Sequence, residues 1–395
     1  MNWKAYNPAW PLHEAMHAAA SRWRRRSLLT PEQQLAIQAA YPLDFYRPGL
    51  FLRIGLFIFA CIGACGGAGF FALLTELDHF RTVAMLGGFG TLAALEFFIR
   101  SSRLYHAGAD QALLYIALGW FSVVLADVVQ DAVPYSSRYD SSLGSSYLFL
   151  ILGPLFLLFL AATIRYADRL VAAGTYLLLL LLLANWLLQV PAGRLVLPFV
   201  LMLASAAAYW LVKRLSQRPD YLYYRRCLML LQALALATFY LAGNYYVVRE
   251  GNAQLSGQHV SAQIPFALLF YLFTAVIPLV YIAIGLRRPS RIWLLTGLAA
   301  AAFSLFTLRY YRSIMPPEIA AVLAGAVLLA LAAWAARYLR PARHGLTSLP
   351  DNDYPSHFNL EALVVAQTTT VPQAPALGFE FGGGHSGGGG ADGNY

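Results

Sequence analysis

Long apolar runs constrain the fold of this chain more than any other feature. A bilayer core about 30 Å thick needs about 20 apolar residues in helical form. A helix also satisfies its own backbone hydrogen bonds in lipid. The runs are too long for barrel strands, and their residues do not alternate between apolar and polar. The sequence predicts ten membrane spans, at about 54–75, 82–99, 110–130, 146–164, 170–189, 193–212, 227–247, 264–286, 291–308 and 318–338.

The composition supports a membrane protein. Of the 395 residues, 59% are hydrophobic and 12% are charged, whereas an average soluble domain is about 25% charged. We therefore expect an all-α fold, a polytopic transmembrane helix bundle. The predicted parts are a cytoplasmic N-terminal arm with two short helices (1–53), the bundle (54–338) and a C-terminal tail (339–395).

The distribution of Lys and Arg predicts the orientation of the chain. With ten spans, the connections after the second, fourth, sixth and eighth spans lie on the same side as the arm and the tail. These segments together hold 22 of the 28 basic residues, and the other connections hold six. Cytoplasmic segments are enriched in basic residues, so both termini are expected in the cytoplasm. We expect a multi-pass protein of a bacterial inner membrane. The arm contains no pattern typical of a cleavable signal peptide, so the first span is expected to direct insertion.

The two ends differ in their local patterns. In the arm, residues 12–26 predict one helix, and a second starts at Thr30-Pro31-Glu32-Gln33, where Thr30 and Gln33 fit a capping box. In the tail, nine of the last 18 residues are Gly. Such a segment cannot bury enough apolar surface to offset its chain entropy, so we expect a disordered tail.

The arm carries an H-E-x-x-H motif at residues 13–17. The spacing places His13 and His17 on one helical face, where they could bind zinc with Glu14 as general base. A catalytic site also needs a third ligand, for which Glu32 and Asp44 are the acidic candidates, and a cleft on a folded domain. Because the arm is short, the polar face of a surface helix is the favoured interpretation. We therefore expect no metal and no cofactor, and a zinc hydrolase is a remote alternative.

A basic cluster follows this motif, at Arg22, Arg24, Arg25 and Arg26. Basic residues near a bilayer attract anionic lipid headgroups, by about 1 kcal/mol each. The cluster also acts as a topology signal, and the two roles are compatible. We expect the lipid bilayer and its anionic headgroups as partners, and no nucleic acid.

Acidic residues within spans are candidates for function. Glu96, Asp110 and Asp127 could line a polar path in a transporter or channel, along the second and third spans. The other interpretation is that these acids are interfacial or paired. For Glu96 the expected partner is Arg100, four residues on. Asp127 shares a helical face with Asp131.

Small residues recur in the first span, as Gly63-x-x-x-Gly67 and Ala60-x-x-x-Ala64. This spacing permits close approach of two helices. We expect it to serve packing within the bundle rather than dimerisation.

Two stretches resemble known proteins. Residues 28–64 (LLTPEQQLAIQAAYPLDFYRPGLFLRIGLFIFACIGA) resemble the start of uncharacterised bacterial polytopic membrane proteins, of a Bacteroidetes-like kind, in which a short cytoplasmic helix precedes many spans. The tail FGGGHSGGGGADGNY is similar to the glycine-rich ends of TPM-domain membrane proteins. Neither resemblance implies a catalytic residue or an activity. The sequence thus favours a non-enzymatic integral membrane protein, active in envelope organisation or as a membrane partner, with transport as the alternative.

Overall fold

The computed structural model describes residues 3–74, 80–134, 142–258, 260–288 and 290–311, together with scattered residues between 319 and 337. Over these residues the chain is all α, as predicted, with twelve helices and no named strand. One isolated bridge pairs Tyr46 with Leu104. The predicted tenth span (318–338) lies largely outside the described residues, and the tail (339–395) lies wholly outside them.

The chain divides into two compact units, and helix α1 (Trp10–Arg25) contributes to both. Of the described residues, the smaller unit contains 16–42. Its second helix, α2 (Pro31–Ala40), begins where the sequence predicts. Thr30 accepts a hydrogen bond from the Gln33 backbone, and the Gln33 side chain accepts one from Thr30, so the predicted capping box is confirmed. Two further bonds join α1 to the α2 segment: Arg24 donates to Gln34 at 2.8 Å, and His17 contacts the Tyr41 carbonyl at 2.7 Å.

The larger unit contains residues 1–15 and the bundle. Within the described residues, nine of its helices are long and apolar enough to cross a membrane, which confirms an integral membrane architecture. A further helix of this unit, α10, is shorter than these nine. The helices are α3 (Leu50–Leu74), α4 (Phe80–Ser101), α5 (Ala109–Ala132), α6 (Ser146–Tyr166), α7 (Arg169–Leu188), α8 (Gly193–Leu215), α9 (Tyr221–Gly243), α10 (Tyr245–Leu255), α11 (Ala267–Arg287) and α12 (Arg291–Tyr311).

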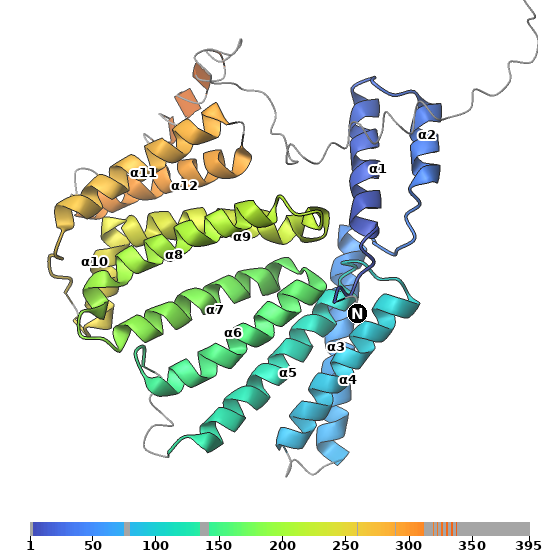
Figure 1. The fold of residues 1–395 in the computed structure, drawn as a ribbon, viewed down its shortest axis with the longest axis horizontal. Coiled ribbons are helices and arrows are strands. Elements are labelled where there is room, and N and C mark those ends of the chain that lie inside the picture. Colours follow the sequence, from blue (N-terminus) through green and yellow to red (C-terminus); the bar gives the residue numbers. More distant parts are fainter. Residues whose placement is uncertain are drawn as a thin grey trace, which may run out of the picture. The chain divides into compact units, whose positions relative to one another are not determined.

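Successive long helices pack as antiparallel neighbours: α4 with α5, α6 with α7, α8 with α9 and α11 with α12 (Figure 1). Helix α3 packs mainly on α5. Residues 3–15 contact one end of this bundle, where α4, α6 and α8 end and α5, α7 and α9 begin. We call this the arm end, and the opposite end the far end. Residues 3–15, which the sequence assigns to a separate arm, thus pack with the bundle.

Helix α9 differs from its predicted span. It begins at Tyr221 rather than near 227 and ends at Gly243, and Asn244 then starts the separate helix α10. The Asn244 side chain accepts hydrogen bonds from the backbone of Tyr246 and Val247, which caps α10. The connection between the predicted spans 227–247 and 264–286 is therefore helical as far as Leu255.

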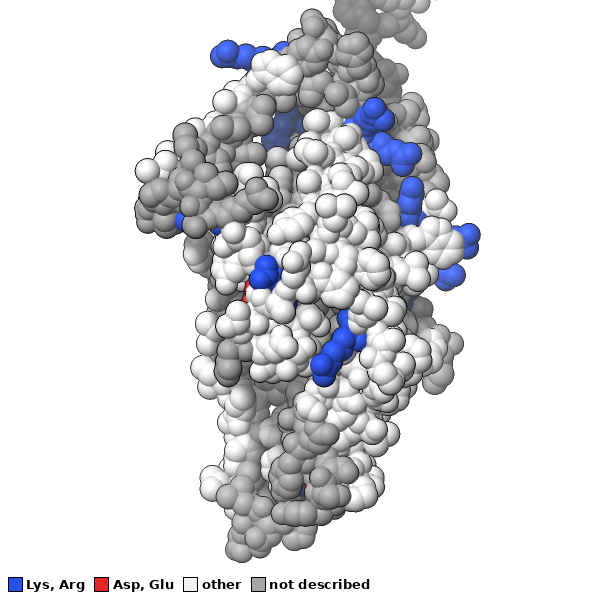
Figure 2. All heavy atoms as spheres, turned by 90° about the vertical axis from the view of Figure 1, so that its left-hand side faces the viewer, with Lys and Arg blue, Asp and Glu red and all other residues white. Residues whose placement is uncertain are grey.

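Apolar side chains cover most of the molecular surface. In Figure 2 the described face is mainly uncharged, with separate Lys and Arg side chains, several of them towards the right of the view, and acidic groups are scarcely visible. Helix α3 is the extreme case, because none of the 18 residues in its most apolar window is buried inside the protein. Such a surface is stable against hydrocarbon rather than water.

Candidate functional site at the arm end of the bundle

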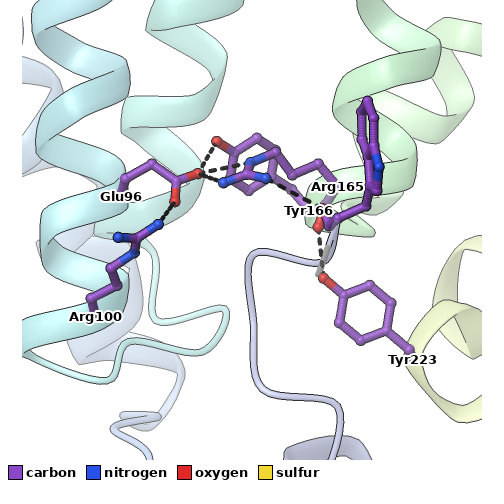
Figure 3. Close-up of polar contacts among 6 residues, drawn as sticks. Glu96, Arg100, Arg165, Tyr166 and Tyr223 are labelled. Atoms are coloured by element: carbon purple, nitrogen blue, oxygen red, sulfur yellow. Dashed lines mark hydrogen bonds and ion pairs between the residues drawn. The ribbon is translucent and has the colours of Figure 1, made fainter. Parts of the chain in front are cut away.

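Glu96 lies at the centre of a charged contact between α4 and α6. Its carboxylate accepts hydrogen bonds from Arg165, at 2.9 and 2.7 Å, and from the Tyr166 hydroxyl, at 2.6 Å (Figure 3). The predicted partner Arg100 approaches only to 3.7 Å, and its side chain is 78% exposed. The main partner is therefore Arg165, 69 residues away, and the i,i+4 pair is secondary.

The end of α6 is held by hydrogen bonds from other segments. The Arg165 carbonyl accepts from the Tyr223 hydroxyl at 2.6 Å (Figure 3). It also accepts from the Ala5 backbone at 3.0 Å. The Cys227 thiol donates to the Ala167 carbonyl. The last carbonyls of a helix have no partner within it, and here residues of α9 and of the N-terminal segment supply the donors.

Asp110 is completely buried at the start of α5. It accepts hydrogen bonds from the Tyr6 hydroxyl at 2.7 Å, from the His106 backbone at 2.8 Å and from the Gly108 backbone at 3.0 Å. Tyr6 belongs to the N-terminal segment, and the other two donors belong to the loop between α4 and α5. One carboxylate thus fixes both segments to the bundle.

Gly108 makes this loop geometry possible. Its φ of +102° lies in the region that favours glycine. A Cβ at this position would lie 2.2 Å from the Arg53 carbonyl oxygen. Only glycine can therefore place its backbone N–H against Asp110 while α3 passes so close.

Four arginines lie near one another and near His106, and we call them the arginine cluster. Arg47 precedes α3, Arg53 lies in its first turn, and Arg169 and Arg226 lie in α7 and α9. Glu14 of α1 accepts hydrogen bonds from both Arg47 and Arg226, the latter at 2.5 Å. Glu14 thus forms ion pairs that attach the start of α1 to the bundle, rather than facing a metal site as a general base would.

Asp168 extends this network into α7. It caps the helix by accepting from the backbone of Leu170 and Val171. It also accepts from Gln111 at 2.7 Å and from the Tyr115 hydroxyl at 2.9 Å, and Gln111 in turn accepts from Arg53. The three helices α3, α5 and α7 are therefore joined at one buried carboxylate.

The protonation states in this region follow from burial and from the arginines. Burial, with smaller contributions from all four arginines of the cluster, holds the pKa of His106 well below its usual 6.5, so this ring is neutral at pH 7. Burial and then Arg226 lower the pKa of Arg47 to about 10. Arg47 is still charged at pH 7, and the cluster concentrates positive charge at the arm end.

Asp127 lies at the far end of α5. Seventeen residues separate it from Asp110, which is about 25 Å along a helix. Arg81 binds Asp127 at 2.6 Å and also binds Asp131, so these two acids share a face as expected. The three acids do not converge, and neither the cavity between α3 and α4 nor the one beside α10 is lined by any of them. This arrangement favours the paired interpretation over a shared path.

The H-E-x-x-H residues have other partners. His17 contacts the Tyr41 carbonyl, and Glu14 is bound to two arginines. Within the described ranges, no three His, Cys, Asp or Glu side chains gather closely enough to hold a metal ion. The observed contacts give the motif residues structural roles on helix α1.

The basic cluster of the arm occupies the last turn of α1 and the residue that follows. Arg24, Arg25 and Arg26 are exposed and Arg22 is half-buried. Arg24 donates to Gln34 and Arg25 contacts the Ser21 carbonyl at 3.4 Å, both uncharged acceptors.

Sequence reasoning missed several residues that hold this site together. Asp168 and Arg165 lie between two predicted spans, where charged residues are common. Nothing in their sequence pattern distinguished them from other charged residues in such connections. The Tyr6–Asp110 hydrogen bond and the pairing of Glu14 with two arginines join segments that are far apart in sequence. A single sequence contains no pattern that predicts such contacts. Comparison of the chain with family models, curated proteins and solved structures found no match.

Proposed function

We propose that this integral membrane protein has a non-enzymatic role in a bacterial inner membrane, in which it holds a basic helical arm at the membrane surface. The arm then binds anionic lipid headgroups through Arg22, Arg24, Arg25 and Arg26. This role fits either envelope organisation or the positioning of a membrane partner.

The observation that carries the proposal is the exposed positive charge at the end of α1. Within the part of the chain that the structure describes, Arg24, Arg25 and Arg26 form no ion pair. Guanidinium groups bind phosphate through paired hydrogen bonds, and a basic segment beside a membrane gains about 1 kcal/mol per residue from anionic lipid. The arm therefore has the charge, the exposure and the chemistry for headgroup contact.

The non-enzymatic part of the proposal rests on how the acids are used. Glu14, Glu96 and Asp168 each accept hydrogen bonds from at least two side chains, and Asp110 is fully enclosed. Such contacts hold helices together and leave little capacity for proton transfer or ion binding. Transport along Glu96, Asp110 and Asp127 stays a prediction that this geometry favours less.

The proposed orientation places the arm end in the cytoplasm. The segments assigned to that side hold 22 of the 28 basic residues, and such an excess is typical of cytoplasmic segments. Anionic lipids give the cytoplasmic leaflet its negative surface potential, so the arm and its lipid partners would lie on the same side.

Trp23, within the basic cluster, allows a direct test. The protein is placed in nanodiscs of phosphatidylcholine, with or without phosphatidylglycerol, and the emission of Trp23 is obtained as the difference between the protein and its Trp23→Phe variant. We expect a blue shift of the Trp23 emission when phosphatidylglycerol is present, because the arm enters the headgroup layer. Replacing Arg22, Arg24, Arg25 and Arg26 by Gln should remove the shift.

The control replaces Lys213, Arg214 and Arg218 by Gln, which lowers the positive charge of the α8–α9 turn and leaves the arm intact. This variant should retain the Trp23 shift. Equal Trp23 spectra in both lipid mixtures for the unmodified protein would refute headgroup binding by the arm.

A further inference from the structure

An apolar cavity lies between α3 and α4 and reaches the start of α5. Its volume is about 680 Å³, which is within the range of small-molecule sites, about 300–1,000 Å³. From α3 it is lined by Leu56, Phe59, Ala60, Gly63, Ala64 and Gly67. These residues repeat every three or four positions and so form one face of the helix.

The lining of the cavity suits hydrocarbon. Among its polar members, Thr91 is already engaged, because its hydroxyl donates within its own helix to the Gly87 carbonyl at 2.7 Å. Tyr46 and Ser102 lie near the arm end of the cavity. The deeper part therefore offers water no useful partner, and an apolar space of this kind does not hold water well.

The glycines in this cavity create space rather than contact. A Cβ added at Gly63, Gly67 or Gly90 would meet nothing within 4 Å. Between α11 and α12 the reverse is true, since a Cβ at Gly285 or Gly297 would lie within 2.9 Å of backbone on the facing helix. The prediction that Gly63 and Gly67 pack closely against another helix is thus wrong as far as the described residues go. These glycines line an open groove instead.

The arm end of the groove carries positive charge with little compensation. Arg103 lies between the lining residues Ser102 and Leu104, is exposed, and forms no ion pair with any residue that the structure describes. Exposed Arg103 thus follows the lining residue Ser102 directly, and an apolar groove with a basic residue at one end complements an anionic amphiphile.

We propose that the groove between α3 and α4 binds one anionic phospholipid, with an acyl chain along Gly63, Gly67 and Gly90 and the phosphate at Arg103. Basic pockets between membrane helices are known to recognise lipid headgroups. The site uses none of the arm arginines, so it can stand or fail independently of the headgroup contact proposed for the arm. A bound lipid would also fill the space that α3 leaves open beside α4.

Native mass spectrometry of the purified protein tests this site. The protein in detergent is given phosphatidylglycerol or phosphatidylcholine with the same acyl chains, and glycerol phosphate as the soluble headgroup alone. We expect one retained phosphatidylglycerol per chain, about a fivefold preference over phosphatidylcholine from Arg103, and no retention of glycerol phosphate. The Gly63→Leu/Gly90→Leu variant should lose most of the bound lipid, because its leucines fill the groove.

Two matched controls separate lipid binding from folding. Gly119 on α5 also has nothing within 4 Å of an added Cβ and does not line the groove, so Gly119→Leu should bind lipid normally. Arg103→Gln should lower the preference for phosphatidylglycerol about fivefold, whereas Arg218→Gln, an exposed change in the α8–α9 turn, should leave it unaltered. An unfolding temperature close to that of the unmodified protein shows that each variant is folded.

Three results would overturn the proposal. Undiminished lipid retention in Gly63→Leu/Gly90→Leu would place the lipid elsewhere. Equal retention of phosphatidylglycerol and phosphatidylcholine would remove the headgroup contact. Loss of a dimer together with unchanged lipid binding in the groove variant would make a second copy of the chain the occupant.

Discussion

Asp110→Ala should destabilise the protein by about 3 kcal/mol or more, because it leaves three buried donors without an acceptor. These donors are the Tyr6 hydroxyl and the backbone N–H groups of His106 and Gly108, each within 3.0 Å of the carboxylate. The loss should appear as a lower midpoint of unfolding in a titration of detergent-solubilised protein with a denaturing detergent. The N-terminal segment should also become more sensitive to protease, since Tyr6 connects it to α5.

The matched control for this prediction is Asp127→Ala on the same helix. Among the described residues, Asp127 is bound by Arg81 alone, in a partly exposed pair near the far end, and such pairs contribute little to stability. Its unfolding midpoint should therefore change much less. Equal destabilisation by the two variants would contradict the structural role that we assign to Asp110. An unchanged unfolding midpoint in both variants would also contradict it.

Asn244→Ala should be the second strongly destabilising change, by about 2–4 kcal/mol. Asn244 is fully buried and makes two kinds of contact. Its side-chain oxygen caps α10, and its amide donates to Tyr240 at 2.8 Å and to Thr307 at 3.2 Å. Alanine removes the cap and leaves the two hydroxyl groups with fewer partners, so α9, α10 and α12 all lose a shared contact.

Gln232→Ala is the control, because Gln232 lies on the same helix α9 and its side chain donates a single bond within the described part of the chain, at 3.3 Å to Tyr209. It should lower the unfolding midpoint far less than Asn244→Ala. Asn244→Asp keeps the capping oxygen and loses the amide donor, so it should fall between the two. An Asn244→Ala protein as stable as Gln232→Ala would contradict the assigned network.

The membrane-spanning helices could be predicted from the sequence because each one depends on local hydrophobicity. Nine expected spans correspond to long apolar helices among the described residues. The α2 start was also predictable, since a capping box is encoded within four residues. The limits of α9 and the existence of α10 were not, because hydrophobicity continues through Asn244 and only its side-chain hydrogen bonds show that the helix is interrupted.

The contacts of the candidate site were harder to predict. Charge spacing gave Arg100 as the partner of Glu96, yet Arg165 binds it more closely from another helix. The motif at residues 13–17 suggested a metal site, whereas Glu14 pairs with Arg47 and Arg226, the latter 212 positions away. Such pairings depend on which helix ends meet in space, and the sequence of one chain does not contain that information directly.

The central expectation is that the bundle crosses a membrane, with the arm and the α8–α9 turn on the same side. Single cysteines at Ser27, Gln217 and Gln254 report on the arm, on the α8–α9 turn at the arm end and on α10 at the far end; all three positions are exposed. The unmodified protein is the control, because Cys61 and Cys65 lie within α3 and Cys227 is buried. We expect a membrane-impermeant maleimide to label Ser27→Cys and Gln217→Cys from one side only, and Gln254→Cys from the other. Labelling of all three from the same side, or of Ser27→Cys and Gln217→Cys from opposite sides, would contradict the account.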